Sequence, residues 1–297
     1  MFILNFKKIS ITILITSFAI TCGIIASLSF ENSFAHNFSP DESAEFLTIV
    51  DKIKVESAIV ANSNANNNQS SAISHAQYAL NTYDSHTNHE LSEKNERIAT
   101  ELNNTLNQLQ DQVETSPSSI TDKSQIKQTL ETINAILDEA VSVRIDDDQL
   151  NNSTIHALVF ADIVNNALQS YGSAFDIGID LTDISNLNTT SNENNTVDNK
   201  HSNHELQNIT DQMNIVNFSS YESALSFADY ALKKFNSEVK TSIPNNNKTQ
   251  NYLEQLENGL LEFNTAIKNK ENPMKVMKIV HTKIHPNLQI VFNLKSE

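Results

Sequence analysis

The sequence predicts an all-α fold: an antiparallel helical bundle followed by a second, shorter related helical unit. Three observations support this prediction. Apolar residues recur at steps of three and four, the 297-residue chain holds only four glycines and five prolines, and a ten-residue segment occurs twice. Steps of three and four place apolar side chains along one face of a helix. The scarcity of glycine leaves few residues suited to hairpin turns or phosphate-binding loops.

The predicted bundle covers residues 36–175 and contains five helices. Its clearest stripe consists of Ile126, Leu130, Ile133, Leu137 and Val141. A second stripe begins at Leu91 and ends before Pro117. Three further helices are predicted at about residues 46–60, 71–83 and 153–174. Antiparallel helices joined by short connections are typical of a bundle.

Residues 176–203 lose this periodicity and are rich in asparagine, which predicts a linker or a long loop. The shorter helical unit is predicted over residues 204–297. Within it, residues 223–232 match residues 71–80 at seven of ten positions, which indicates an internal repeat. Near the end, Pro273 should begin a helix that Pro286 stops. Residues 288–294 fit either a strand or a last helical turn.

The first 35 residues have the features of a signal peptide or membrane anchor. Lys7 and Lys8 precede an apolar run at residues 9–28, and the small-residue site Ser33-Phe34-Ala35 follows. The run is long for a cleaved signal, so tethering to the membrane through residues 9–28 is the alternative to secretion. Either alternative places the remaining residues outside the cell or on its surface.

The charge and the single cysteine exclude several classes of function. A net charge of −16 argues against nucleic-acid binding, which requires clustered lysine and arginine. Cys22, the only cysteine, lies in the apolar run, so we expect no disulfide in the exported part. Candidate N-glycan sites are the ten Asn-x-Ser/Thr sequences that begin at Asn37, Asn68, Asn103, Asn151, Asn152, Asn188, Asn194, Asn208, Asn217 and Asn247.

A duplicated His-x-Asn-His-Glu-Leu motif is the strongest chemical signal in the sequence. Histidines three positions apart, followed by a glutamate, can share one helical face and suit Zn(II) or Cu(II). The alternative is that both motifs are solvated helix starts, in which polar residues cap the helix. The predicted metal ligands are His86, His89 and Glu90 in the first copy and His201, His204 and Glu205 in the second.

Other titratable residues fit structural roles better. His75 aligns with Phe227 of the repeat and is therefore expected in the core, whereas His281 and His285 are predicted to form a surface pair. Asp162 and Asp229, beside apolar stripes, should need an ion-pair partner such as Arg97 or Arg144, or a helix cap. Neither Gly-x-Ser-x-Gly nor His-Glu-x-x-His occurs, and we predict that the protein is not an enzyme.

Three stretches, at residues 38–43, 136–144 and 150–154, resemble uncharacterised exported helical proteins of ammonia-oxidising archaea. They read Phe-Ser-Pro-Asp-Glu-Ser, Ile-Leu-Asp-Glu-Ala-Val-Ser-Val-Arg and Leu-Asn-Asn-Ser-Thr. The resemblance covers about residues 38–175 and involves no segment of known chemistry. It implies a cell-surface setting in organisms that depend on copper.

Together these features predict an exported, non-enzymatic helical binding protein whose ligand is a divalent metal, Cu or Zn. The alternative is a glycosylated structural or adhesive envelope protein, which contacts other envelope proteins and binds no small ligand.

Overall fold

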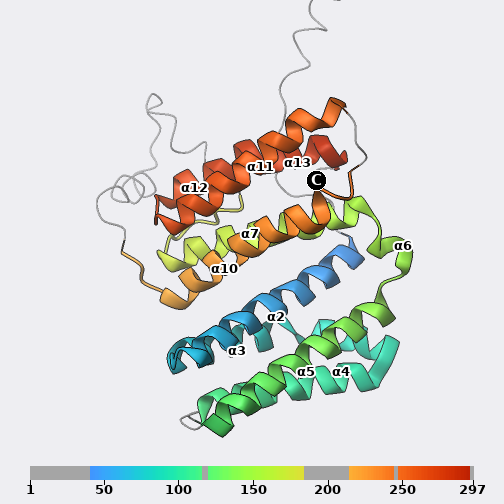
Figure 1. Cartoon of the computed structure of the whole chain (residues 1–297), viewed down its shortest axis with the longest axis vertical. Coiled ribbons are helices and arrows are strands. Elements are labelled where there is room, and N and C mark those ends of the chain that lie inside the picture. Colours follow the sequence, from blue (N-terminus) through green and yellow to red (C-terminus); the bar gives the residue numbers. More distant parts are fainter. Residues whose placement is uncertain (1–40, 116–119, 184–213, 244–246, 295–297) are drawn as a thin grey trace, which may run out of the picture. The chain divides into compact units, whose positions relative to one another are not determined.

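The computed structural model describes residues 41–115, 120–183, 214–243 and 247–294. Two compact units are distinguished, Met1–Ala35 and His36–Glu297, and every described residue belongs to the second. Across these residues all regular structure is helical and no strand occurs (Figure 1). The predicted all-α fold is therefore confirmed.

The first group of helices begins at Asp41, whose side chain accepts hydrogen bonds from the backbone amides of Ser43 and Ala44. A single apolar core joins the group, and it includes the Ile126 to Leu137 stripe expected from the sequence. Short connections between helices are typical of a bundle. The helices of this group are α2 (Glu42–Ala65), α3 (Gln69–Thr82), α4 (Ser85–Glu114) and α5 (Ile120–Arg144).

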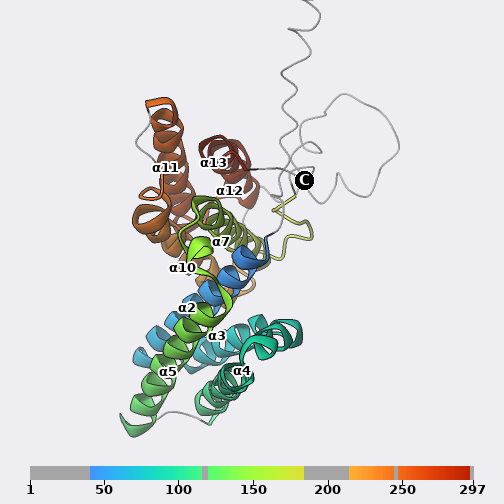
Figure 2. The ribbon, with the colours of Figure 1, turned by 90° about the vertical axis from the view of Figure 1, so that its right-hand side faces the viewer.

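The second group has its own core, centred on α7 and α10 (Figure 2). Phe160, Tyr171, Phe235 and Phe263 are among its fully buried side chains. Its elements are α7 (Ser153–Ala174), α10 (Phe218–Lys234), the π-helix η2 (Phe235–Val239), α11 (Asn247–Lys268), α12 (Pro273–Ile279), the π-helix η3 (Val280–Ile284) and α13 (His285–Phe292). The short helix α6 (Asp147–Leu150) precedes α7, and its Leu150 packs against the first core.

Helix α2 contributes to both cores. Side chains on one side, Val50 and Ile53 among them, belong to the first core. Val55 and Ile59, on another side, belong to the second. A helix buried on two sides needs apolar residues over more than one stripe. Helix α2 therefore lies between the two groups and joins them.

The predicted linker at residues 176–203 does not separate the two apolar cores. Helix α7 precedes it and α10 follows it, yet α7 and α10 pack against each other and share one core. The predicted units 36–175 and 204–297 remain a description of sequence organisation. In space, the last helix of the first unit packs with the second.

The C-terminal segment differs from expectation at Pro286. The helix that begins at Pro273 passes through η3 and restarts as α13, with Pro286 in the first turn. Proline is tolerated there because the first amides of a helix have no intrahelical acceptor. Residues 288–292 are consequently helical, and Asn293 ends the helix in the left-handed conformation.

The N-terminal predictions lie outside the described residues. These are the signal peptide or anchor at residues 1–35 and its apolar run at residues 9–28. Among the helices of the described ranges, none combines the length and the apolarity that crossing a bilayer demands.

Candidate functional site

A cleft of about 450 Å³ lies between α2 and α10. Each helix lines it with residues that recur every three or four positions, so each presents one stripe to it. Apolar side chains form its middle, and charged or amide side chains lie among them. The lining consists of Lys54, Val55, Ala58, Ile59 and Asn62 from α2, and Glu222, Leu225, Ser226, Asp229, Tyr230 and Lys233 from α10.

Polar contacts show that α2 and α10 run antiparallel along the cleft. Tyr230 donates a hydrogen bond to Asp51 Oδ1 over 2.7 Å. Ser223, two turns earlier in α10, donates to Glu56 Oε1 over 2.8 Å, although Glu56 is later in α2. One end of the cleft therefore lies near Tyr230 and the other near Glu222.

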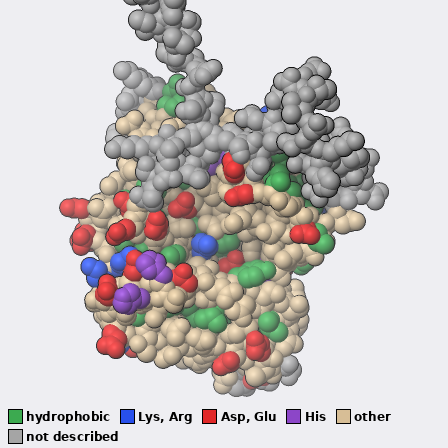
Figure 3. Space-filling view, turned by 180° about the vertical axis from the view of Figure 1, so that it is seen from behind, with side chains coloured by type: hydrophobic (Ala, Val, Ile, Leu, Met, Phe, Trp, Pro, Cys, Tyr) green, Lys and Arg blue, Asp and Glu red, His purple; other side chains and the backbone are tan. Residues whose placement is uncertain are grey.

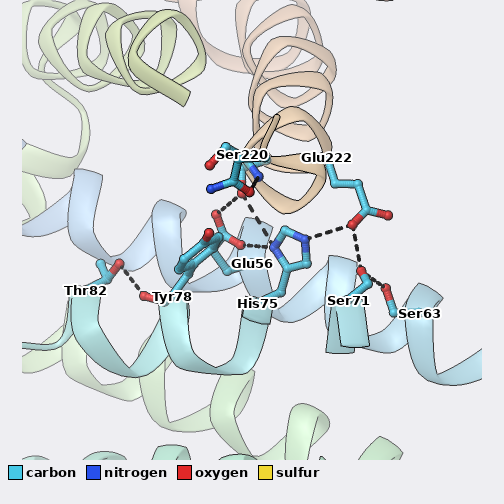
Figure 4. A network of polar contacts seen from close by, with 10 residues as sticks. Glu56, Ser63, Ser71, His75, Tyr78, Thr82, Ser220 and Glu222 are labelled. Atoms are coloured by element: carbon cyan, nitrogen blue, oxygen red, sulfur yellow. Dashed lines mark hydrogen bonds and ion pairs between the residues drawn. The ribbon is translucent and has the colours of Figure 1, made fainter. Parts of the chain in front are cut away.

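A buried network holds Glu222 in place (Figure 4). The His75 ring, 0% exposed, lies between two carboxylates. Its Nδ1 is 2.6 Å from Glu56 Oε2, and its Nε2 is 3.3 Å from Glu222 Oε2. Ser71 donates to the same Glu222 oxygen over 2.8 Å and contacts Ser63 over 2.7 Å. Glu222, whose side chain is 22% exposed, therefore joins this network to the cleft.

The network connects three helices rather than forming a metal centre. Glu56 and Glu222 lie at opposite nitrogens of the His75 ring, so their oxygens do not converge on one point. In the described ranges, no three His, Cys, Asp or Glu side chains are grouped closely enough to hold a metal ion. Because buried polar groups need partners, the network fixes α3 and α10 against α2.

A second cluster fixes the other end of the cleft. Lys234 Nζ lies 2.9 Å from Asp51 Oδ2 and 2.7 Å from Glu238 Oε2. Burial opposes the charge of Lys234, but these two carboxylates outweigh it and raise its pKa. A contact with His156, together with Lys234, lowers the pKa of Glu238 to about 2 against the effect of burial. The cluster is therefore ionic at neutral pH.

The first copy of the predicted metal motif lies at the start of α4. His86 and His89 are 77% and 71% exposed, and their Nε2 atoms lie 3.2 Å from Glu90 Oε1 and 3.5 Å from Glu93 Oε1. The other oxygen of Glu90 accepts a hydrogen bond from Arg144. Two histidines are thus available on the surface, but the neighbouring carboxylate is already in an ion pair.

The second copy, His201, His204 and Glu205, lies outside the described residues. The Cu or Zn site therefore stays a prediction. Figure 3 shows exposed histidines beside acidic and basic side chains, while the other acidic side chains are spread across that face. Such spreading is typical of a solvated acidic surface.

The predicted surface pair His281 and His285 is wrong, because both rings are buried. They lie edge to face at a centroid distance of 5.4 Å, and His281 Nε2 donates to the carbonyl of Leu181 over 3.0 Å. The residue that contacts His281, Leu181, lies in the segment after α7 and is 100 positions away in the sequence. Helix α11 also approaches η3 closely, since a Cβ at Gly259 would lie only 3.1 Å from that of Lys283.

The predicted arginine partners of Asp162 and Asp229 are also wrong. Asp162 accepts a hydrogen bond from Thr48 over 3.3 Å, and Asp229 accepts from Asn264 and Lys268. Both arginines are used elsewhere, since Arg97 pairs with Glu101 and Glu139 and Arg144 pairs with Glu90. Lysines and uncharged donors on neighbouring helices replaced the partners expected from the sequence.

Sequence reasoning placed His75 in the core, and its burial confirms that. It missed Glu222 as the link to the cleft. A signal was present in the repeat, since Ser71 and Ser223 occupy equivalent positions and each donates to a carboxylate, Glu222 and Glu56 respectively. Periodicity alone does not show which repeats face each other.

Comparison of the chain with protein-family models, with curated protein sequences and with solved structures gave no match. The resemblance to exported archaeal proteins therefore stays an expectation.

Proposed function

We propose that this protein is a non-enzymatic binding protein that holds a small organic ligand in the cleft between α2 and α10. The observation that carries the proposal is a cleft whose walls are fixed at both ends by buried polar clusters. Its volume of about 450 Å³ lies within the range of about 300–1,000 Å³ that is usual for ligand sites. Fixed walls favour binding, because little ordering has to accompany it.

The surroundings of His75 favour binding over catalysis. An acid–base residue must reach the reacting group directly or through one water. His75, the histidine next to the cleft, is fully buried, and both of its ring nitrogens face carboxylates. It therefore supports Glu222 and does not face the ligand.

The test uses anilinonaphthalene sulfonate, a fluorescent probe with an apolar body and one negative charge. Val55, Ile59 and Leu225 would contact its rings, and the two lysines of the cleft would attract its charge. We expect the full chain to bind it saturably. Ala58→Trp, which fills the cleft, should weaken binding at least about tenfold, a loss of about 1.4 kcal/mol.

Ala61→Trp is the matched control, because Ala61 is exposed on the same helix one turn away and does not line the cleft. It should bind the probe as the natural chain does. Equal binding by all three proteins would place the probe elsewhere and remove the proposal.

The remaining expectations from the sequence go with this proposal as hypotheses. They are export to the cell surface, a Cu or Zn ion at the six motif residues, glycans on the asparagine sites and contact with envelope proteins. Exposure of Asn68, Asn103, Asn151, Asn152 and Asn217 is compatible with glycan attachment.

A further inference from the structure

The two ends of the cleft differ in charge. Asp51 contacts both Tyr230 and Lys234, and Lys54 and Lys233 line the cleft beside these residues. This end therefore offers ammonium groups, which lie among the carboxylates of Asp51 and Asp229. Glu222 and Asn62 line the opposite end, where Ser71 of α3 contacts both Ser63 of α2 and Glu222 of α10. That end offers a carboxylate and an amide.

At each end one charged group has capacity for a ligand. Glu222 uses Oε2 for its contacts with His75 and Ser71, and Figure 4 shows its other oxygen pointing away from the network. Lys54 is committed to Asp138 over 2.6 Å. Lys233 is exposed, and its charge also acts on Asp229, whose carboxylate is held by Lys268. The ends thus present Oε1 of Glu222 and the ammonium of Lys233.

The length between these groups limits the ligand. Glu222 and Lys233 are eleven positions apart on α10, which corresponds to about 16 Å at 1.5 Å per residue. An extended peptide spans a similar length with four or five residues at about 3.3 Å each. Its middle would lie along Ile59 and Leu225, with Ser226 available to its backbone.

We infer that the cleft binds short linear peptides with free ends, the terminal ammonium at Glu222 and the terminal carboxylate at Lys233. This inference rests on the proposed binding function and specifies its ligand class. Opposite charges at the two ends also set the direction of the peptide. With its ammonium at Glu222 and its carboxylate at Lys233 it lies parallel to α10, and the reverse direction would lose both ion pairs.

Penta-alanine tests the inference by displacing bound anilinonaphthalene sulfonate from the full chain. The peptide with free ends should displace the probe at the lowest concentration. Acetylating its amino end or amidating its carboxyl end should each raise the half-displacing concentration about threefold to tenfold, as expected of partly exposed charge-assisted contacts.

Two variants assign the ends. In Glu222→Gln, acetylated and free peptides should become equivalent, and in Lys233→Gln, amidated and free peptides should. Lys278→Gln, at an exposed lysine outside the cleft, should keep the full preference for free ends. Lys233 is on the surface, so its variant tests the inference even if Glu222→Gln disturbs folding.

The outcomes separate the two proposals. Equal displacement by all three peptides, or none by any of them while Ala58→Trp still blocks the probe, overturns the peptide inference and leaves the binding cleft. Probe binding that ignores Ala58→Trp overturns the binding function itself.

Discussion

At the scale of single residues, the α2–α10 interface depends on buried charges whose partners come from other helices. His75 on α3 contacts Glu56 on α2 and Glu222 on α10. Lys234 on α10 contacts Asp51 on α2. A buried charge without a partner is strongly unfavourable, so a shifted register of α10 would leave several charges unpaired. These pairs therefore select one alignment of the helices.

Asp162 on α7 is less well compensated. Burial, together with the repulsion of Glu45, raises its pKa to about 6. The hydrogen bond from Thr48 and the attraction of Lys52 act in the opposite direction. Between its unfolded pKa of about 3.9 and about pH 6, the native state holds a proton that the unfolded state has released. Stability therefore falls as the pH rises through this window, and the full cost is present above it.

Replacing Asp162 by asparagine should remove this cost. We expect Asp162→Asn to raise the free energy of unfolding at pH 7 by up to about 3 kcal/mol, from about two pKa units at about 1.4 kcal/mol each. The gain should disappear by about pH 4. Urea unfolding at several pH values measures it. Asp111→Asn, at an exposed site on α4, is the control, and a gain that does not depend on pH would contradict the explanation.

At the scale of helices, the start of α4 depends on a single side chain. Asp84 accepts hydrogen bonds from the backbone amide and the hydroxyl of Thr87 over 2.8 and 2.9 Å. These bonds lower the pKa of Asp84. Asp146 occupies the same capping position before α6, but its side chain makes no capping hydrogen bond.

The two aspartates form a matched pair for measuring the cap. Asp84→Ala should lower the free energy of unfolding by about 1 kcal/mol, while Asp146→Ala should change it by less than about 0.5 kcal/mol. Since the folded pKa of Asp84 is lowered, its contribution is present above the unfolded pKa and declines as the pH falls below about 4. Thermal melting at pH 7 and pH 3 follows this loss, and equal effects of the two variants would refute it.

Most helices could be predicted because their buried stripes are continuous. Residues 153–174 were predicted as one helix, and α7 has those bounds. The C-terminal segment was harder to predict, because the π-helix η3 leads directly into α13 and Pro286 lies in the first turn of that new helix. Buried His281 contacts Leu181, which is 100 positions away in the sequence, and no local pattern reveals such a contact.

The candidate site was not predictable in the same way. The two histidines of the motif that begins at His86 are exposed on α4, and α4 contributes no residue to the cleft lining. Glu222 lies between Tyr221 and Ser223 in the sequence, and its contacts with His75 and Ser71 give it a role that its sequence neighbours do not indicate. Such contacts join residues about 150 positions apart, and periodicity describes one helix at a time.

At the scale of the whole molecule, the predicted metal ligands come from both copies of the duplicated motif. We expect Zn(II) or Cu(II) to raise the melting temperature of the full chain. At a metal concentration one hundred times Kd, binding should stabilise the folded state by about 2.7 kcal/mol. Replacing His86 and His89 by alanine should abolish the shift, as should replacing His201 and His204. If neither metal shifts the transition of the natural chain, the prediction fails.

The position of α2 between the two cores also bears on synthesis. Ribosomes deliver the amino end first, and domains generally begin to fold in that order. Helix α2 can pack on α3 to α5 once residue 144 has emerged, but the core that contains Val55 and Ile59 is complete only after α7 and α10, which both contact α2, have been made. During that interval, we expect apolar side chains of α2 to be exposed on the nascent chain.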